Sequence, residues 1–476
     1  MTASTTFADR LQDRVGPIVV KEVRQGLRAK VFAIFFSVLL TACLMAALVA
    51  VAEVSDRTGD STLGRNFLAA YLIALAAVTC FVIPFTAFRS MLREQEEETW
   101  VLLLLTGLGG RNIVRGKWVS AMSQAMLFAS AAAPFVVFTY FLNGIDIPQI
   151  VVALALLGAW SCLLTALGIA IATQAHSRIG RTFAHFVALA TLGAGTFAAM
   201  AFGTLLSEQG SRLMQRTEFL TFCGAVFAFA LSVTVLVLEG AAAGLALPSE
   251  PASAGPRKVL TAMVVGTLAF GAIASFVNGS SKEAGAVGSL VSSFFLVVCG
   301  VFAISERDGF PARLAGMGWL KPGALRGYWL IIGLLMLCTI GWGVLYGIAP
   351  GGDGSGKRLR VLLAAPLFPA LYLSLGAFFG RVTALRKAGE PLASRIAFAV
   401  TVLLGSVVPP IIATVGGGRG DDKSVNALNP VVGMVNFIDR GGDELDGALL
   451  LLAAVTLLFV FLAGSVLWTR DGVRSA

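Results

Sequence analysis

Hydrophobic residues dominate this chain in long runs, which short polar or glycine-rich segments separate from one another. About 20 consecutive apolar residues are enough for a helix to cross the hydrocarbon core of a bilayer. Runs of that length recur from one end of the chain to the other, which predicts an all-α polytopic membrane protein with about twelve transmembrane helices. The predicted spans lie approximately at 31–52, 66–88, 118–142, 149–173, 182–206, 219–240, 259–277, 285–304, 328–349, 359–380, 396–415 and 447–468.

Composition and charge support this class and suggest an orientation. The chain is 57% hydrophobic and 13% charged, whereas soluble domains carry about 25% charged residues. Twelve spans put both termini on one side, and 25 of the 36 Lys and Arg residues fall on that side. Cationic loops stay in the cytoplasm, so we expect a multi-pass protein of the cell (inner) membrane with both termini cytoplasmic. The basic residues form no single patch, which argues against a nucleic-acid partner.

A segment rich in proline, serine and alanine separates the first six predicted spans from the last six. We therefore divide the chain into a first six-span membrane domain at 1–247, a cytoplasmic linker at 248–258 and a second six-span membrane region at 259–476. The loop 305–327 occupies the same place in the second half as 89–117 in the first. Their spacing of charged and apolar residues is loosely similar, and both a degenerate duplication and chance would explain it.

Residues that could carry chemistry are sparse. The six cysteines all lie inside apolar runs without a CxxC pair, as small packing residues do, and the two histidines form no ligand motif. The sequence from Gly351 to Lys357 nearly spells a phosphate-binding loop. However, Arg358 stands where a Ser or Thr would hold Mg²⁺, and the predicted topology puts this loop outside. We therefore expect no catalytic, cofactor or metal site in this chain, and no enzyme activity of its own.

Charged residues are rare in the middle of the predicted spans. Glu239 is the one acidic residue far along a span, and its distance from the span's start favours a position near the cytoplasmic interface. Carriers driven by protons or sodium usually need ionisable groups near the middle of the bilayer. The pattern therefore argues against ion-coupled transport and suggests that driving force reaches the protein through its cytoplasmic surface.

The segment before the first span has helical periodicity. Aliphatic residues recur every four positions at Val15, Val19, Val23 and Leu27. Charged residues fall elsewhere around the helix at Lys21, Glu22, Arg24 and Arg28. Pro17 is near the start, where a helix tolerates proline. This pattern predicts an amphipathic helix that lies in the membrane interface, and a soluble N-terminal helix is the alternative.

The loop between the second and third spans carries the most distinctive pattern of the chain. Four glutamates, Glu94, Glu96, Glu97 and Glu98, lead into Thr99 and Trp100. An apolar run follows at 101–105, then a glycine-rich break at 106–110, and then the basic residues Arg111, Arg115 and Lys117. The apolar run is too short to cross a bilayer and too apolar for a solvated loop. Either lipid headgroups or another protein should cover it.

This loop resembles the cytoplasmic coupling region of ABC-2 type ABC-transporter permeases. In that family an E-x-E-x-x-T stretch precedes a Leu-rich helix, a Thr-[Pro/Gly]-Leu break and an Ile-Val-x-Gly-Lys lead into the third span. The matching positions are Glu94, Glu96, Thr99, Leu102, Leu103, Leu104, Leu105, Thr106, Leu108, Ile113, Val114, Gly116 and Lys117. Glu98 stands where Gly is usual, Trp100 where Leu is common and Gly107 where Pro is common, so the break in the coupling helix is expected to be looser.

The N-terminal segment resembles the same family. Residues 16–25 are similar to the P-I-V-x-K-E-[LV]-R sequence that opens many of these permeases and forms their interfacial elbow helix. Here the elbow residues implied by the resemblance are Pro17, Lys21, Glu22 and Arg24. The clear resemblance covers about residues 15–120, with a compatible six-span organisation to 247. It does not extend to the second half with any specificity.

The resemblance implies a division of labour between two polypeptides. A cytoplasmic ABC ATPase subunit would bind ATP and Mg, cover the short helix 100–108 and push on spans two and three when its dimer closes. The implied coupling residues are Glu94, Glu96, Glu97, Glu98, Thr99, Trp100, Leu102, Leu103, Leu104, Leu105, Thr106, Leu108 and Arg111. The glutamates would pair with the ATPase or with basic residues of the elbow helix. The alternatives are a solvated acidic helix start and an interfacial Leu-rich helix without a partner.

The expected function is that of a membrane-spanning permease subunit of an ATP-driven ABC exporter. The expected partners are cytoplasmic ABC ATPase subunits and membrane lipid. A second permease chain joins them if two chains pair through their first halves, and it is not needed if one chain supplies both six-span halves. The alternative function is an ATP-independent secondary carrier or a membrane scaffold protein.

Overall fold

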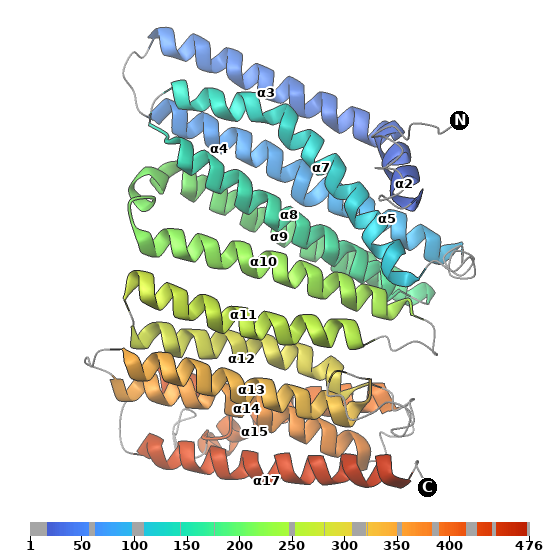
Figure 1. The fold of residues 1–476 in the computed structure, drawn as a ribbon, viewed down its shortest axis with the longest axis vertical. Coiled ribbons are helices and arrows are strands. Elements are labelled where there is room, and N and C mark those ends of the chain that lie inside the picture. Colours follow the sequence, from blue (N-terminus) through green and yellow to red (C-terminus); the bar gives the residue numbers. More distant parts are fainter. Residues whose placement is uncertain are drawn as a thin grey trace, which may run out of the picture. The chain divides into compact units, whose positions relative to one another are not determined.

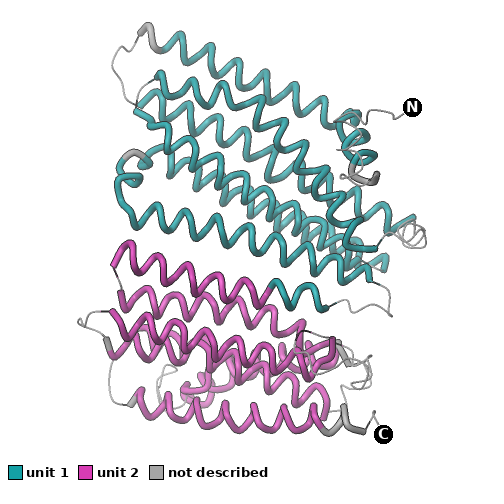
Figure 2. The backbone as a smooth tube through the Cα atoms, viewed as in Figure 1, with its two compact units in different colours: residues 1–259 teal, residues 260–476 magenta. Residues whose placement is uncertain are grey.

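The computed structural model describes residues 17–56, 62–97, 109–142, 144–175, 177–246, 253–279, 281–306, 320, 322–349, 355–382, 390–415, 426–439 and 444–473. This part of the chain is helical and contains no strand. Twelve of its helical segments are long and apolar enough to cross a membrane. The predicted class, an all-α polytopic membrane protein, is therefore confirmed. The chain forms two compact units, residues 1–259 and residues 260–476 (Figure 2).

The helices of unit 1 follow the order of the predicted spans (Figure 1). They are α2 (Pro17–Arg28), α3 (Lys30–Asp56), α4 (Thr62–Ala76), the π-helical segment η1 (Ala77–Val82), α5 (Ile83–Glu96), α7 (Gly110–Phe141), α8 (Ile147–Thr173), α9 (Arg178–Leu213) and α10 (Thr217–Gly244). The second span is the continuous run α4–η1–α5. It extends beyond the apolar residues into a polar last turn, which carries two of the glutamates predicted to couple, Glu94 and Glu96.

Unit 2 begins within helix α11 (Ala254–Asn278). Its other helices are α12 (Lys282–Ile304), α13 (Ala324–Ile348), α14 (Ser355–Val382), α15 (Glu390–Val415), α16 (Val432–Asp439) and α17 (Glu444–Val473). The last five residues of the predicted linker 248–258 are thus the first turn of α11. The short helix α16 lies between the last two predicted spans, 396–415 and 447–468.

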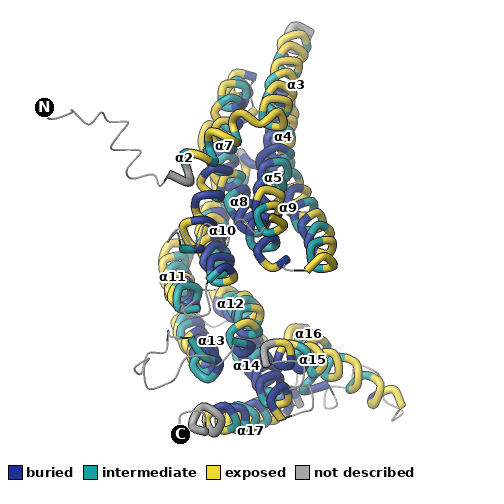
Figure 3. The backbone as a smooth tube through the Cα atoms, turned by 90° about the vertical axis from the view of Figure 1, so that its right-hand side faces the viewer, coloured by how far each residue is buried: buried dark blue, intermediate teal, exposed yellow. Residues whose placement is uncertain are grey.

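The core of unit 1 lies where α4, α5, α7 and α8 meet. Its fully buried side chains include Leu68, Tyr71, Phe88, Met91, Phe128 and Ile169. In contrast, α3 is exposed along most of its length (Figure 3). It is attached to α7 by Phe32 and Phe36, whose rings lie 5.1 and 5.6 Å from that of Phe128. Exposed aliphatic and aromatic residues on membrane-spanning helices are the expected surface for lipid.

A π-helical turn interrupts the second span, and a side chain of a neighbouring helix donates a hydrogen bond to the backbone carbonyl that the turn leaves free. In η1 the Ile83 N–H bonds the carbonyl of Val78, five residues back. The next bond of that series would come from residue 84, but Pro84 has no N–H. The carbonyl of Thr79 accepts instead from the Ser161 hydroxyl of α8, at 2.7 Å. A buried carbonyl left unpaired inside a membrane costs several kcal/mol, so this contact explains why the irregular turn is tolerated.

Two helix prolines of unit 2, Pro366 and Pro410, are compensated in a similar way. Pro366 cannot bond the carbonyl of Leu362, which accepts from the Ser289 hydroxyl of α12 at 2.9 Å. In α15, Pro410 leaves the carbonyl of Ser406 free of its helical donor, and the Asn429 amide donates to it at 3.0 Å.

The same asparagine also caps α16. Its Oδ1 accepts from the N–H groups of Val431 and Val432 at 2.9 and 3.0 Å. One buried amide thus satisfies both the proline interruption of α15 and the start of α16, as buried polar groups in a low dielectric require.

Candidate functional site

Helix α2 turns sharply away from the direction of α3 (Figure 1). Pro17 is its first residue, in agreement with the predicted helix start. Helix α2 packs mainly on α7. There, Gly26 faces the side chain of Gln124 so closely that a Cβ at Gly26 would clash with that side chain. Lys21 and Arg24 are exposed, whereas Glu22 is turned toward α7. The predicted amphipathic helix is present, and its position in a membrane interface stays a prediction.

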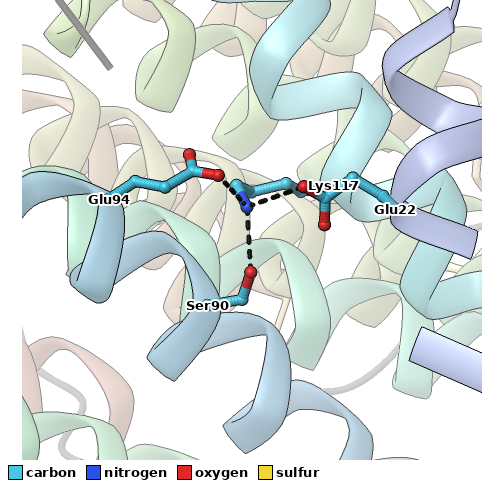
Figure 4. Close-up of polar contacts among 4 residues, drawn as sticks. All are labelled: Glu22, Ser90, Glu94 and Lys117. Atoms are coloured by element: carbon cyan, nitrogen blue, oxygen red, sulfur yellow. Dashed lines mark hydrogen bonds and ion pairs between the residues drawn. The ribbon is translucent and has the colours of Figure 1, made fainter. Parts of the chain in front are cut away.

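Lys117 of α7 is the centre of a charged cluster that joins three helices (Figure 4). Its side chain is 3% exposed. Its Nζ lies 2.7 Å from Glu94 Oε1 and donates to Ser90 Oγ at 2.9 Å. Glu22 of α2 supplies the third contact, at 3.4 Å. An ammonium has three N–H donors, so each donor has one partner in this geometry. The cluster is called the Lys117 cluster below.

The local sequence explains part of this arrangement. Ser90 and Glu94 are four residues apart on α5, which puts both side chains on one face of the helix. Lys117 is two turns into α7, on the face that also presents buried Val114 and Ala121 to the core. Burying an ammonium without partners would be strongly unfavourable. The two carboxylates and the hydroxyl therefore stabilise Lys117 only while α2, α5 and α7 stay together.

A second ion cluster joins the start of α7 to the end of α10. Arg111 and Arg115 are four residues apart, and their guanidinium groups lie 2.7 and 2.8 Å from the two carboxylate oxygens of Glu239. The Glu239 side chain is 6% exposed, and both arginines are about half exposed. Glu239 is therefore paired with residues at the start of α7 rather than standing alone in the bilayer.

The end of α5 makes further contacts with its neighbours. Glu96 pairs with Arg181 of α9 at 3.7 Å, and Glu97 with Arg93 of its own helix at 3.3 Å. Exposed pairs of this kind contribute little stability, about 0–1 kcal/mol. Gln95 donates to the carbonyl of Thr173 at the end of α8, at 3.3 Å. The last turn of α5 thus touches α7, α8 and α9 at once.

The predicted coupling residues therefore separate into two groups. Glu94, Glu96, Glu97 and Arg111 are described, and each has a charged partner within unit 1. Glu98, Thr99, Trp100, Leu102, Leu103, Leu104, Leu105, Thr106 and Leu108 lie outside the described residues. We expected the glutamates to pair with the ATPase or with basic residues of the N-terminal helix, and pairing with the ATPase stays a prediction. Within unit 1, the N-terminal helix contributes an acid to this cluster, Glu22, which shares Lys117 with Glu94.

Sequence reasoning missed the focal role of two residues. Lys117 was noticed as the end of the Ile-Val-x-Gly-Lys motif, but its position in a span's first turns did not show which acids it meets. Ser90 carried no signal, because serines in membrane helices usually bond their own backbone. In the part of the chain that the structure describes, no three His, Cys, Asp or Glu side chains are arranged to hold a metal ion.

No family model matches this chain, and no curated protein matches its sequence. A function is therefore inferred from the residues themselves and from the contacts described above.

Proposed function

We propose that this chain is the membrane-spanning permease subunit of an ATP-driven ABC exporter, with both termini in the cytoplasm. The residues that support the proposal are the two motifs at 16–25 and 94–117, correctly spaced around the first two spans. ATP and Mg bind in a separate cytoplasmic ATPase, whose surface groove receives the apolar segment 100–108. The ATPase covers the Leu run that neither water nor a membrane span accommodates.

The Lys117 cluster is the observation that carries this proposal furthest. The segment 98–108 continues from α5 at one end and into α7 at the other. Glu94, near the end of α5, and Lys117, near the start of α7, are in direct contact at 2.7 Å. Glu22 adds α2 to the same block. A push on the segment would therefore move α2, α5 and α7 together rather than being absorbed by a loose loop.

The distribution of buried charge favours this function over an ion-coupled carrier. The buried charged residues in the described part of the chain are Lys117, Glu239, Arg257 and Arg381. Each lies within about two turns of a helix end, measured at 3.6 residues per turn. Ion-coupled carriers bind their coupling ions near the middle of the bilayer. A driving force that enters from the cytoplasm fits this distribution better.

The proposal is tested by co-purification with ATPases encoded beside this chain. The wild-type chain is expected to retain one of them in detergent. The double variant Leu103→Asp, Leu104→Asp should weaken that binding by at least about 30-fold, because losing even one central interface residue typically costs about 2 kcal/mol or more. The double variant Ser249→Asp, Ala252→Asp, in the linker, is the matched control, since it adds the same two negative charges to another segment that we expect in the cytoplasm.

Two results would contradict the proposal. In the first, the Leu103→Asp, Leu104→Asp variant binds the ATPase as tightly as the wild type does. In the second, transport or assembly proceeds without any ATPase partner and follows an ion gradient, as the alternative of an ATP-independent secondary carrier requires. A scaffold protein would assemble with its partners without ATP and without a gradient.

A further inference from the structure

A cavity of about 790 Å³ lies beside the Lys117 cluster, between α2, α3, α5 and α7. Pockets that bind small molecules typically measure about 300–1,000 Å³, so this one is large enough for a ligand. All of its walls belong to unit 1. The four residues that Figure 4 draws, Glu22, Ser90, Glu94 and Lys117, are among its lining residues.

The lining of the cavity changes from charged to apolar along its length. The charged lining residues are Lys21, Glu22, Arg93, Glu94, Glu97 and Lys117. They come from α2, the last turns of α5 and the first turns of α7, which meet at one end of the bundle. The large apolar lining residues are Val31, Phe32, Phe35, Val82, Ile83 and Phe128. They come from α3, from the junction of η1 with α5 and from a later turn of α7.

Two walls show this gradient independently. Along α7 the lining residues run from Lys117 through Gln124 to Phe128, a distance of about 16 Å at 1.5 Å per residue. Along α5 they run in the opposite chain direction, from Glu94 back to Ile83. A cavity of a membrane protein that has a charged end and an apolar end fits an amphiphilic ligand. A purely polar solute would leave the apolar end empty.

The charges at the polar end balance one another. Three cationic and three anionic side chains line it. Lys117 is already surrounded by its three partners, so its charge is compensated. Lys21 and Arg93 are exposed, and the Arg93–Glu97 pair uses one of the five N–H donors of the guanidinium. A ligand with both a negative and a positive group would find a partner for each.

We propose that this cavity binds an aminophospholipid with an ethanolamine headgroup. Its phosphate lies beside Lys21 and Arg93, and its primary ammonium lies beside Glu97. One acyl chain follows the apolar end, along Phe32, Phe35 and Phe128. This binding does not depend on the proposed transport function.

The chemistry of the polar end selects a primary amine over a choline group. A primary ammonium donates three hydrogen bonds, and carboxylates are the strongest acceptors for them. A quaternary ammonium has no N–H and is typically held by aromatic rings. The aromatic residues that the structure describes in this lining, Phe32, Phe35 and Phe128, stand at the apolar end. The polar end thus offers carboxylates and no described aromatic ring, which favours an ethanolamine headgroup over a choline headgroup.

The experiment measures lipid binding to the full chain in detergent by native mass spectrometry. The probes are dioleoyl lipids with ethanolamine, choline or glycerol headgroups, added one at a time. The ethanolamine lipid is expected to bind at one copy per chain, about ten-fold more tightly than either of the others, which corresponds to about 1.4 kcal/mol. Equal binding of all three lipids, tighter binding of the anionic glycerol lipid, or no specific copy would overturn the proposal.

Two threonine variants locate the site. Thr86→Trp fills the cavity from α5 and should abolish the specific copy. Thr86 lines the cavity, and its hydroxyl only bonds its own helix at Ile83. The matched control is Thr204→Trp on α9, where the hydroxyl again bonds its own helix, at Ala201, and the residue does not line the cavity. Unchanged binding by a folded Thr86→Trp chain would contradict the site.

Charge variants keep the test valid if Thr86→Trp does not fold. Lys21→Ala and Arg93→Ala alter exposed residues, so the fold should tolerate both. Each should weaken the ethanolamine lipid by about ten-fold, the usual cost of one charge-assisted hydrogen bond. Glu97→Gln should narrow the preference for ethanolamine over choline while leaving the choline lipid unchanged. The proposed headgroup contacts would be overturned if these variants kept both the affinity for the ethanolamine lipid and the preference for it over the choline lipid.

Discussion

Lys117 is the residue on which most of the proposed mechanism depends. It is buried, and its ammonium is held by side chains from two other helices. Its partner Glu22 is 95 residues away in the sequence. The contact therefore forms only after α2 has packed on α7, and it reports on that packing. The same cluster forms a wall of the cavity, so changes at Lys117 affect both proposals at once.

Replacing Lys117 with methionine tests the cluster. The Lys117→Met chain keeps much of the side-chain volume but removes the ammonium that Glu22 and Glu94 share. Removing one partner of a buried ion group typically costs about 3–5 kcal/mol, so the apparent melting temperature in detergent should fall clearly. Lys30→Met, at the exposed start of α3, is the control and should melt like the wild type.

A second change at the same site separates charge from packing. Adding Glu94→Gln to Lys117→Met removes the negative charge of one of the two carboxylates that faced Lys117 and should recover part of the lost stability. If Lys117→Met and Lys30→Met lower the melting temperature equally, the cluster does not hold the three helices together.

At the scale of elements, the spans were predictable and their interruptions were not. A run of apolar residues is a local property, so all twelve spans could be located without knowing the fold. The prolines were visible in the sequence as well, but the side chains that bond the carbonyls freed by them were not. Ser161 and Thr79 are 82 residues apart, and Ser289 and Leu362 are 73 apart. In the sequence, a serine whose hydroxyl bonds a carbonyl of another helix cannot be told from any other serine.

The π-helical turn of the second span gives a test of such a bond. Ser161→Ala removes the donor to the Thr79 carbonyl and should destabilise the chain by about 1 kcal/mol, within the range for hydrogen bonds between membrane helices. Pro84→Ala supplies a backbone N–H to the same carbonyl. In the Ser161→Ala background it should therefore restore stability.

The melting temperatures of the two single variants and the double variant measure this coupling. Ser232→Ala is the control, because its hydroxyl bonds only its own helix, at Ala228. Strictly additive effects of Ser161→Ala and Pro84→Ala would mean that the two residues do not share the Thr79 carbonyl.

At the scale of the whole molecule, the candidate site was half predictable. The sequence pointed to both segments that form it, 16–25 and 94–117, because each carries a motif of its own. It did not show that Glu22 and Glu94 would share one lysine, nor that a cavity would lie beside them. Contacts between segments separated by a full membrane span depend on helix packing, which is not written in any local pattern.

Membrane orientation decides whether the proposed function is possible, since an ATPase reaches only the cytoplasmic side. Labelling with a membrane-impermeant maleimide tests it. Asn143→Cys, between the third and fourth spans, should react in intact cells, whereas Ser249→Cys, in the linker, should react only after permeabilisation. The six native cysteines are buried or half-buried within predicted spans, so they should add little background labelling. The opposite pattern would put segment 98–108 outside the cell, where no ATP-driven partner could act on it, and would exclude the proposed function.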